Sequence, residues 1–205
     1  MSFGEEQQRT QAKPERWRVF FAVELPANLR ERAAEHIACL RDALPEVRAG
    51  WEREEKMHLT LKFLGEIGTS RFASLSSAAE LAAQNFQPFT CGIENAGTFP
   101  ERGQPRVLWL GVSDASGNLA RLQQALENEC ARAGFAREER AFRPHLTLAR
   151  VRAPKGARRL AELHQEMGFE LMEFPVTEMV LIRSERRPEG SRYTVISRHS
   201  LDIGS

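Results

Sequence analysis

The sequence predicts an α+β fold in which two lobes, related by a pseudo-two-fold axis, meet at a central cleft. One tetrapeptide occurs twice, as His58-Leu59-Thr60-Leu61 and as His145-Leu146-Thr147-Leu148, so that the second copy begins 87 residues after the first (position 145 against 58). Each copy lies inside a half whose pattern is typical of strand, helix, His-bearing strand, helix and strand. The first strands also start at matching places, with Arg18 40 residues before His58 and Arg106 39 residues before His145. A single duplication of a half-domain explains these observations, because a period of about 87 residues is too long for a solenoid repeat.

The first half opens with the apolar run 18–25, which predicts a buried strand that Pro26 ends. Pro26 also suits the start of a helix, because its missing N–H would have no partner there. The apolar residues that follow recur at helical spacing, and Pro45 marks the end of this helix. Their positions are Leu29, Ala33, Ile37, Leu40 and Leu44.

The first His strand is predicted over 57–64, where polar and apolar residues alternate, and Gly65 is expected to break it. The hydroxyl of Ser70 can cap the next helix, whose apolar side extends to Phe86. The half then closes with a strand over 89–96.

The second half repeats this order. A strand is predicted over 106–112, and the turn 116–118 leads into a helix that Gly134 ends. The second His strand covers 145–151, with the same alternation as the first.

The end of the chain completes the second half and adds one strand. A helix is predicted over 157–167 and a strand over 174–183. A last strand over 193–201 has no clear counterpart in the first half, and we expect it to pair with its predecessor as a hairpin across 187–190.

Length and composition bound the domain organisation. The 205 residues suffice for one large domain or two small lobes, and 41% hydrophobic residues support a core. Residues 1–16 are polar and lack the apolar segment of a signal peptide, which predicts a disordered tail. The rest, 17–205, is expected to form a single bilobed domain with halves at about 17–97 and 105–201.

Charge and cysteine usage restrict the partners and the compartment. The net charge of +1 gives no overall field towards nucleic acid or membrane, although a local arginine-lined groove could still bind phosphates. Three cysteines without close pairing predict buried free thiols in a reducing compartment, and hence a cytoplasmic protein. No membrane partner is expected, and nothing indicates an oligomer interface, so a monomer is predicted.

The two His-Thr pairs are the candidate functional residues. On a strand, the His and Thr of each copy point to one face and the two Leu to the other. Two ordinary strands that happen to carry His are the alternative, but packing does not require His and Thr on the polar face twice. A zinc site is a further alternative, although it commonly needs three or four His, Cys or carboxylate ligands. His36 and His164 are predicted to face solvent on helices and Thr is a poor zinc ligand, so no metal or cofactor is expected.

Two His and two Thr together suit phosphoryl chemistry. One imidazole can take the proton of the nucleophile, and the other, protonated, can give a proton to the departing oxygen. Both side chains titrate near neutral pH, so that opposite protonation states can coexist. The Thr hydroxyls can donate hydrogen bonds to the non-bridging oxygens, where charge must be held in the transition state.

This constellation resembles the two-histidine phosphoesterase superfamily, whose signature is two His-x-Thr-x motifs. Within it the sequence is most similar to the bacterial and archaeal RNA 2′,3′-cyclic phosphodiesterases, also called 2′-5′ RNA ligases. The stretches that carry the resemblance are 20–26, 58–65, 105–112 and 142–150. The resemblance implies two lobes, each a mainly antiparallel sheet with helices on the outside.

The resemblance also implies a reaction and roles. RNA with a 2′,3′-cyclic phosphate end, including tRNA fragments, would be hydrolysed to a 2′-phosphate without a metal, and tRNA halves could be joined reversibly through a 2′-5′ bond. His58 would protonate the leaving ribose 3′ oxygen, and His145 would activate or orient water. The reverse assignment stays open because the site is pseudo-symmetric. Thr60 and Thr147 would bind the phosphate oxygens.

Weaker site candidates lie close to the motifs. By the resemblance, Phe63 stacks on the terminal base and Arg150 binds a phosphate, each five residues after its His. Strict alternation places both on the Leu face, so they reach the cleft only if the strand bulges or ends first. Lys62 shares the His58 face under strict alternation and is a second candidate cation for RNA, and Arg143 is a weaker one. The open alternatives are a non-catalytic RNA-end binding module and a phosphodiesterase of small cyclic nucleotides.

Overall fold

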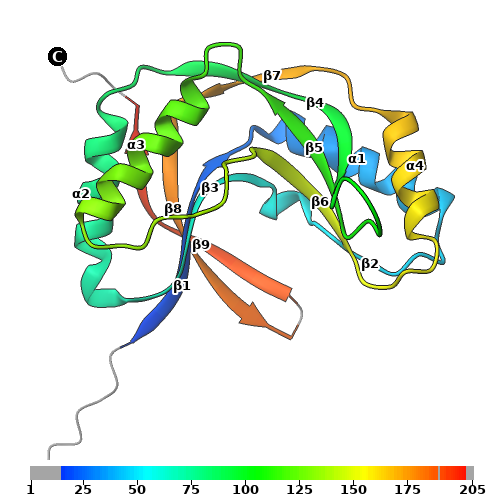
Figure 1. Ribbon diagram of the computed structural model, residues 1–205, viewed down its shortest axis with the longest axis horizontal. Helices are drawn as coiled ribbons and strands as arrows, with labels where there is room; N and C mark the ends of the chain where they lie inside the picture. The colour runs from blue at the N-terminus through cyan, green and yellow to red at the C-terminus, as the bar shows by residue number, and fades with distance from the viewer. Residues whose placement is uncertain (1–14, 189, 202–205) are drawn as a thin grey trace, which may run out of the picture.

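The computed structural model describes residues 15–188 and 190–201, so most of the predicted tail lies outside the described residues. The described part contains two antiparallel sheets and four α-helices, which confirms the predicted α+β class (Figure 1). Sheet A has the strand order β3 (His58–Gly68), β1 (Arg16–Glu24), β8 (Glu178–Arg187) and β9 (Gly190–Ser200). Sheet B has the order β2 (Ala49–Trp51), β6 (His145–Val151), β5 (Val107–Ser113), β4 (Phe89–Phe99) and β7 (Met172–Val176).

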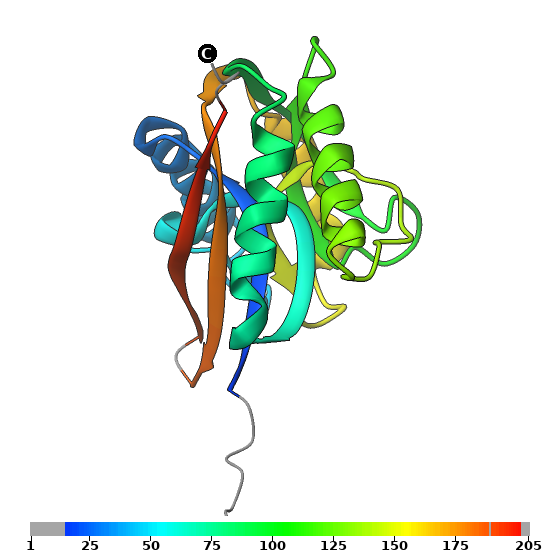
Figure 2. The same cartoon turned by 90° about the vertical axis from the view of Figure 1, so that its left-hand side faces the viewer.

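The helices cover the outer faces of the sheets. Helices α2 (Phe72–Ala83) and α3 (Asn118–Arg132) lie side by side over sheet A (Figure 2). Helices α1 (Ala27–Ala43) and α4 (Ala157–Met167) contact each other on the side of sheet B. Two short 3-10 turns, η1 (Glu54–Lys56) and η2 (Thr69–Arg71), flank β3. No helix of the described residues is long and apolar enough to cross a membrane.

The apolar core is continuous through both sheets and all four helices. Alternate residues of β1, including Phe21 and Val23, point into this core. The residues between them, Phe20 and Ala22, join Val180 and Ile182 in a smaller cluster on the other face of sheet A. This second face of sheet A is the one that carries the site described below.

The two His strands occupy equivalent places. In sheet A the order is His strand β3, first strand β1 and then β8; in sheet B it is His strand β6, first strand β5 and then β4. The third strand of each set comes from the other half of the chain, so the halves exchange their last strands. The duplication itself stays a prediction, but the exchange means that neither sheet is built from one half alone.

Several predicted boundaries are wrong for identifiable reasons. Gly65 does not end β3 but continues it with a φ of +71°, beside a register shift against β1. The predicted strand 174–183 is two strands, because the chain crosses from sheet B to sheet A at Thr177. Arg16 belongs to β1 rather than to the tail, and Ser70 lies in η2 and makes no cap hydrogen bond. The short strand β2, which pairs with β6, lies in a stretch where no strand was predicted.

Candidate active site

Both His strands carry an irregularity at the same relative position. In the pairing of β1 with β3, Phe21 is opposite Lys62 and Ala22 is opposite Thr60, which leaves Leu61 as an extra residue. In the pairing of β5 with β6, Leu148 is extra in the same way, between Thr147 and Ala149. Such a bulge breaks the two-residue alternation and returns the following side chains to the opposite face.

The bulges decide which side chains reach the His face. The burial sequence along both strands is the same, with two successive buried residues after the Thr and then an exposed one. The exposed residue is Phe63 on β3, with 44% of its surface accessible, and Arg150 on β6. Both side chains line the cleft together with the histidines. Phe63 and Arg150 were expected to reach the cleft only if their strands bulged or ended first. A bulge is present before each of them.

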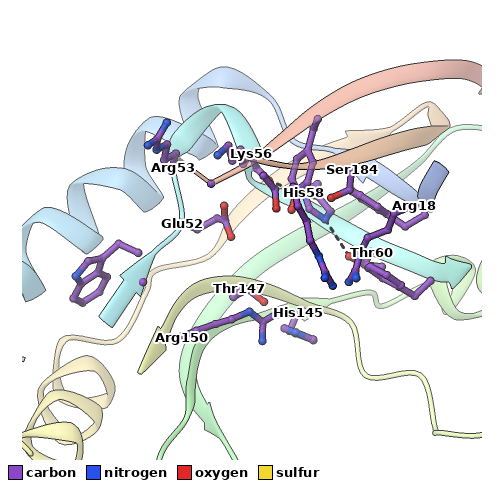
Figure 3. A pocket seen from close by; sticks show the side chains of 18 of the residues that line it. Arg18, Glu52, Arg53, Lys56, His58, Thr60, His145, Thr147, Arg150 and Ser184 are labelled. Atoms are coloured by element: carbon purple, nitrogen blue, oxygen red, sulfur yellow. Dashed lines mark hydrogen bonds between the residues drawn. The ribbon is translucent and has the colours of Figure 1, made fainter. Parts of the chain in front are cut away.

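A cleft of about 620 Å³ brings the two motifs together. His58 and Thr60 project into it from β3, and His145, Thr147 and Arg150 face them from β6 (Figure 3). Other walls come from β1, β2, η1, β8 and β9. The remaining lining residues are Arg18, Phe20, Gly50, Trp51, Glu52, Arg53, Lys56, Phe63, Arg152, Ser184, Arg186, Gly190, Ser191 and Tyr193.

The two imidazoles are held in the same way. The Nδ1–H of His58 donates to the carbonyl of Lys56 at 2.6 Å, and the Nδ1–H of His145 donates to the carbonyl of Arg143 at 2.8 Å. A carbonyl can only accept, so each contact places a proton on Nδ1 and leaves Nε2 as the variable nitrogen. Nε2 of His58 lies 3.1 Å from the hydroxyl of Thr60.

The surroundings of His58 favour its neutral form. Burial lowers the pKa of His58, the hydrogen bond to Lys56 opposes this, and the nearby His145 lowers the pKa further. Aromatic rings cause much of the burial, since Phe20 lies 4.8 Å and Tyr193 5.5 Å from the imidazole, centre to centre. His145 has one such neighbour, the edge-on ring of Phe99 at 5.1 Å.

The cleft is strongly cationic although the chain as a whole carries a net charge of only +1. Among the residues that the structure describes, six lining side chains are cations, namely Arg18, Arg53, Lys56, Arg150, Arg152 and Arg186. One carboxylate, Glu52, lies among these lining residues, and burial raises its pKa against the opposing effects of the Arg53 backbone, Lys56 and Arg150. Such a concentration of positive charge in a concave surface suits a phosphate-bearing ligand.

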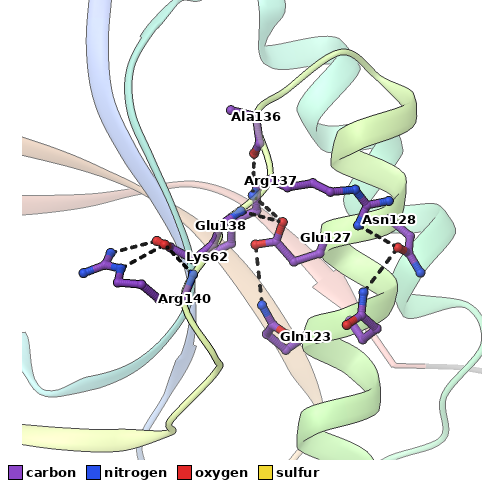
Figure 4. Close-up of polar contacts among 9 residues, drawn as sticks. Lys62, Gln123, Glu127, Asn128, Ala136, Arg137, Glu138 and Arg140 are labelled. Atoms are coloured by element: carbon purple, nitrogen blue, oxygen red, sulfur yellow. Dashed lines mark hydrogen bonds and ion pairs between the residues drawn. The ribbon is translucent and has the colours of Figure 1, made fainter.

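Lys62 is not a cleft residue, and its prediction as an RNA-binding cation is wrong. The bulge at Leu61 turns its side chain to the other face, where it is 3% exposed. Its Nζ donates to Glu127 of α3 at 2.7 Å and to the carbonyl of Ala136 at 2.9 Å (Figure 4). Lys62 therefore joins β3 to α3.

Arg143 also stands outside the cleft. Its exposed guanidinium pairs with Glu101 at 2.7 Å, and its contribution to the site is the backbone carbonyl that orients His145. His36 and His164, predicted to face solvent, are buried and hydrogen-bonded to each other at 2.8 Å.

Sequence reasoning missed most of the cleft's cations. Arg18 lies two residues before Phe20 on β1, so strand alternation could have placed it on the same face. Glu52, Arg53 and Lys56 lie in the unpredicted stretch around β2 and η1, where no periodic pattern marks them. Tyr193 comes from β9. The pairing of this strand with β8 was predicted, but which of its side chains face the cleft was not.

No group of three or more His, Cys, Asp or Glu side chains within the described residues is arranged to hold a metal ion. Metal independence of the reaction stays a prediction, and a chelator experiment below tests it.

Comparison with known proteins places the chain in a family. The sequence profile of the 2′-5′ RNA ligase superfamily matches residues 24–188. A Methanothermobacter thermautotrophicus protein named RNA 2′,3′-cyclic phosphodiesterase is 35% identical over 180 residues, which are 86% of this chain and 95% of that protein. The Escherichia coli protein of the same name is 32% identical and the match covers 90% and 96% of the two chains.

The fold is also similar to those of solved structures. A crystal structure from Thermus thermophilus has a TM-score of 0.73 at 28% identity, covering 90% of this chain and 97% of that one. Escherichia coli LigT complexed with 3′-AMP has a TM-score of 0.71 at 30% identity, covering 91% and 99%. Because the matched region contains both His strands and most of the chain, the protein belongs to the 2′-5′ RNA ligase superfamily.

Proposed function

We propose that the protein hydrolyses RNA 2′,3′-cyclic phosphate ends to 2′-phosphate ends by acid–base catalysis between His58 and His145, without a metal. The observation that carries this proposal is the matched pair of imidazoles. Each has its Nδ1 fixed on a backbone carbonyl, which leaves Nε2 as the nitrogen that can gain or lose a proton within one cationic cleft. The names of the relatives support the substrate class.

The reaction balances with these two groups. One Nε2 accepts a proton from water as the water oxygen forms a bond to phosphorus. The bond from phosphorus to the ribose 3′ oxygen breaks, and the other imidazole, protonated, gives its Nε2 proton to that oxygen. The products are a 2′-phosphomonoester and a free 3′-hydroxyl, and the two imidazoles have exchanged protonation states.

Thr60, Thr147 and Arg150 hold the phosphate in this scheme. The two hydroxyls donate to non-bridging oxygens from opposite walls of the cleft, and the guanidinium adds a charge-assisted contact. Phe63 offers an exposed ring for the terminal base.

From the resemblance described above, we assign the acid role to His58 and the base role to His145. The lowered pKa of His58 favours the neutral ring before substrate binds. A bound phosphate anion has the opposite effect, since an adjacent negative charge favours the imidazolium. His58 therefore takes up its proton together with the substrate.

Ligation of tRNA halves through a 2′-5′ bond belongs to the same proposal, with a 5′-hydroxyl in place of water. Its oxygen forms the bond to phosphorus as the bond from phosphorus to the ribose 3′ oxygen breaks, and attack by that 3′-hydroxyl reverses the step. We further propose that the protein acts in the cytoplasm, on the cysteine usage described above, and that it is a monomer.

The test is hydrolysis of an RNA oligomer with a 2′,3′-cyclic phosphate end in excess chelator. Wild type should yield a 2′-phosphate end, and His58→Ala and His145→Ala should each lose about 10²–10⁴-fold in kcat with the circular dichroism spectrum unchanged. Activity that survives in either variant contradicts the acid–base scheme, and loss of wild-type activity with chelator contradicts metal independence. Tight binding of the oligomer without turnover by wild type would instead support the RNA-end binding module.

A further inference from the structure

The active-site cleft continues into a second hollow at the open end of sheet A. This hollow measures about 220 Å³, and it shares Arg18, Ser184 and Arg186 with the cleft. It runs along the start of β1 and the β8–β9 hairpin, which extends beyond the other strands (Figure 1). The positions on the cleft side of this region are Arg16, Arg18, Ser184, Arg186 and Ser191, and we term them the hairpin track.

The two-residue alternation of β8 places its arginines on two different faces of the strand. Arg183 and Arg187 lie on the same side as Glu185, which pairs with them at 3.2 Å and 3.9 Å. Arg186 points to the other side, into the cleft. Within the described residues no carboxylate forms an ion pair with Arg186 or Arg18, although Glu66 and Glu185 also line the second hollow, so both guanidinium groups stay available to a phosphate.

An aromatic surface lies where the track meets the cleft. The exposed ring of Phe63 stacks on Phe20 with a centroid distance of 5.6 Å and an interplanar angle of 4°. The guanidinium of Arg18 lies over the Phe63 ring, 4.8 Å from its centroid. A base-stacking ring followed by unpaired guanidinium groups is the arrangement that single-stranded nucleic acid binds, because bases stack on the ring while phosphates contact the cations.

We propose that the hairpin track binds the single-stranded nucleotides on the 5′ side of the cyclic phosphate. The preferred substrate is then an RNA end of several nucleotides rather than a free cyclic nucleotide. This inference rests on the proposed function and adds the part of the substrate that the catalytic groups do not contact.

The opposite exit of the cleft, near β2 and η1, is the competing path. It also contains cations, but Glu52 lies among them and interacts with Lys56 and Arg150. Carboxylates lie at both ends of the cleft, because Glu66 and Glu185 line the second hollow. What favours the hairpin track is the exposed ring of Phe63 with Arg18 over it, whereas the aromatic ring at the opposite exit, Trp51, is half-buried. Arg152 belongs to that exit and serves to test it.

The experiment compares kcat/KM for a single-stranded tetranucleotide with a 2′,3′-cyclic phosphate end and for a 2′,3′-cyclic mononucleotide. Wild type should prefer the tetranucleotide, and Arg186→Ala should reduce the ratio of the two values by about tenfold. The matched control is Arg132→Ala, which removes the same charge from the exposed side of α3, away from the residues that line the cleft and the second hollow, and should leave the ratio unchanged. Arg186→Ala should also reduce the slope of log kcat/KM against log salt for the tetranucleotide by about 0.7, the value for one phosphate contact on a single strand.

Three results would overturn the proposal. The first is a wild type without preference for the tetranucleotide. The second is an equal reduction of the ratio by Arg186→Ala and Arg132→Ala. The third is a reduction by Arg152→Ala but not by Arg186→Ala. Failure of the proposed function looks different, because wild type then hydrolyses neither substrate, and both proposals fall together.

Discussion

At the scale of single residues, the site depends on two imidazoles whose Nδ1 atoms are fixed by carbonyls two positions earlier in the chain. The repeated His-x-Thr-x pattern predicted this pair correctly as neighbours in space. It could not predict the difference between them, which comes from the aromatic rings of Phe20 and Tyr193 around His58.

That difference predicts the pH dependence of the reaction. With His58 as the acid, kcat/KM should fall as pH rises through the lowered pKa of His58, that is, from below 6.5. The pH dependence of kcat/KM reports the free enzyme, whereas that of kcat reports the enzyme–substrate complex. Because bound phosphate raises the pKa of His58, the fall in kcat should come at higher pH. Steady-state kinetics across pH 4–9 measure both.

The residual activity of His145→Ala is the control, and it should keep the alkaline fall because His58 is still present. If kcat/KM instead rises through this pH range and the rise persists in His145→Ala, His58 is the base and the two roles are reversed.

The failed prediction for Lys62 belongs to the same scale. Alternation counted from His58 places Lys62 in the cleft and Phe63 in the core, and the structure has the opposite arrangement. The reason is one extra residue at Leu61, and nothing in the local composition marks it as a bulge. The two-residue alternation therefore assigns side chains to the correct face of a strand up to a bulge, and to the wrong face after it.

At the scale of elements, the buried Lys62–Glu127 pair fastens β3 to α3. Glu127 is 5% exposed and also accepts a hydrogen bond from the backbone N–H of Glu138 at 3.3 Å, so the pair holds the 136–138 loop as well (Figure 4). A buried charge that loses its partner is strongly destabilising.

Lys62→Met should lower the free energy of unfolding by about 3–5 kcal/mol, measured by urea denaturation, because it leaves Glu127 buried and unpaired. Lys62→Met/Glu127→Leu should recover most of that loss. Arg140→Met, which removes the exposed partner of Glu138, should change stability little. If Lys62→Met is as stable as wild type but has a raised KM for RNA, then Lys62 binds substrate after all.

A second buried polar contact joins α1 to α4. His36 donates from Nε2 to Nδ1 of His164, and Nε2–H of His164 donates to the carbonyl of Trp109 at 3.0 Å. Burial, with contributions from His164 and Arg32, lowers the pKa of His36 to about 4, and burial also lowers the pKa of His164. Trp109 pairs with Thr147, so this chain of contacts ends directly behind the active site.

This pair predicts an acid-sensitive stability. A histidine whose pKa is lower in the folded than in the unfolded state contributes stability above pH 6.5 that is lost as pH falls towards 4. The loss from His36 should approach about 3 kcal/mol at pH 4, from 1.36 kcal/mol per pKa unit. His36→Gln keeps a donor for His164 but does not titrate, so its melting temperature should fall less between pH 7 and pH 4 than that of wild type.

Cys39→Ser, on the exposed side of the same helix, is the matched control and should follow wild type. An equal fall for His36→Gln and wild type would show that the pair does not govern acid stability.

At the scale of the whole molecule, the order of elements was predictable and the way they pair was not. Periodicity located both His strands, and it gave the bounds of β6 and α4 as the structure has them. It could not show that β4 joins sheet B and β8 joins sheet A, because strand periodicity is local and partner choice depends on the whole chain. The division of 174–183 between two sheets was missed for the same reason.

The exchange of strands predicts that the halves do not fold separately. In a fragment ending at Phe99, β1 and β3 lack β8, and β4 lacks its partner β5. Such a fragment should show no cooperative thermal unfolding by circular dichroism, whereas co-expression with a fragment starting at Val107 should restore both folding and activity. A cooperative transition in the first fragment alone would mean that each half is an independent unit.

The exchanged strands also have a mechanical consequence. Within the described residues the backbone passes between the two sheets four times, at β1–β2, β2–β3, β3–β4 and β7–β8, so the two walls of the cleft are tied together twice in each direction. Two rigid bodies joined by a single linker can swing apart, but two sheets that are joined by four connections and share one apolar core cannot do so without exposing that core. The spacing between the two imidazoles is thus set when the chain folds, and substrate must slide in along the groove rather than be closed upon.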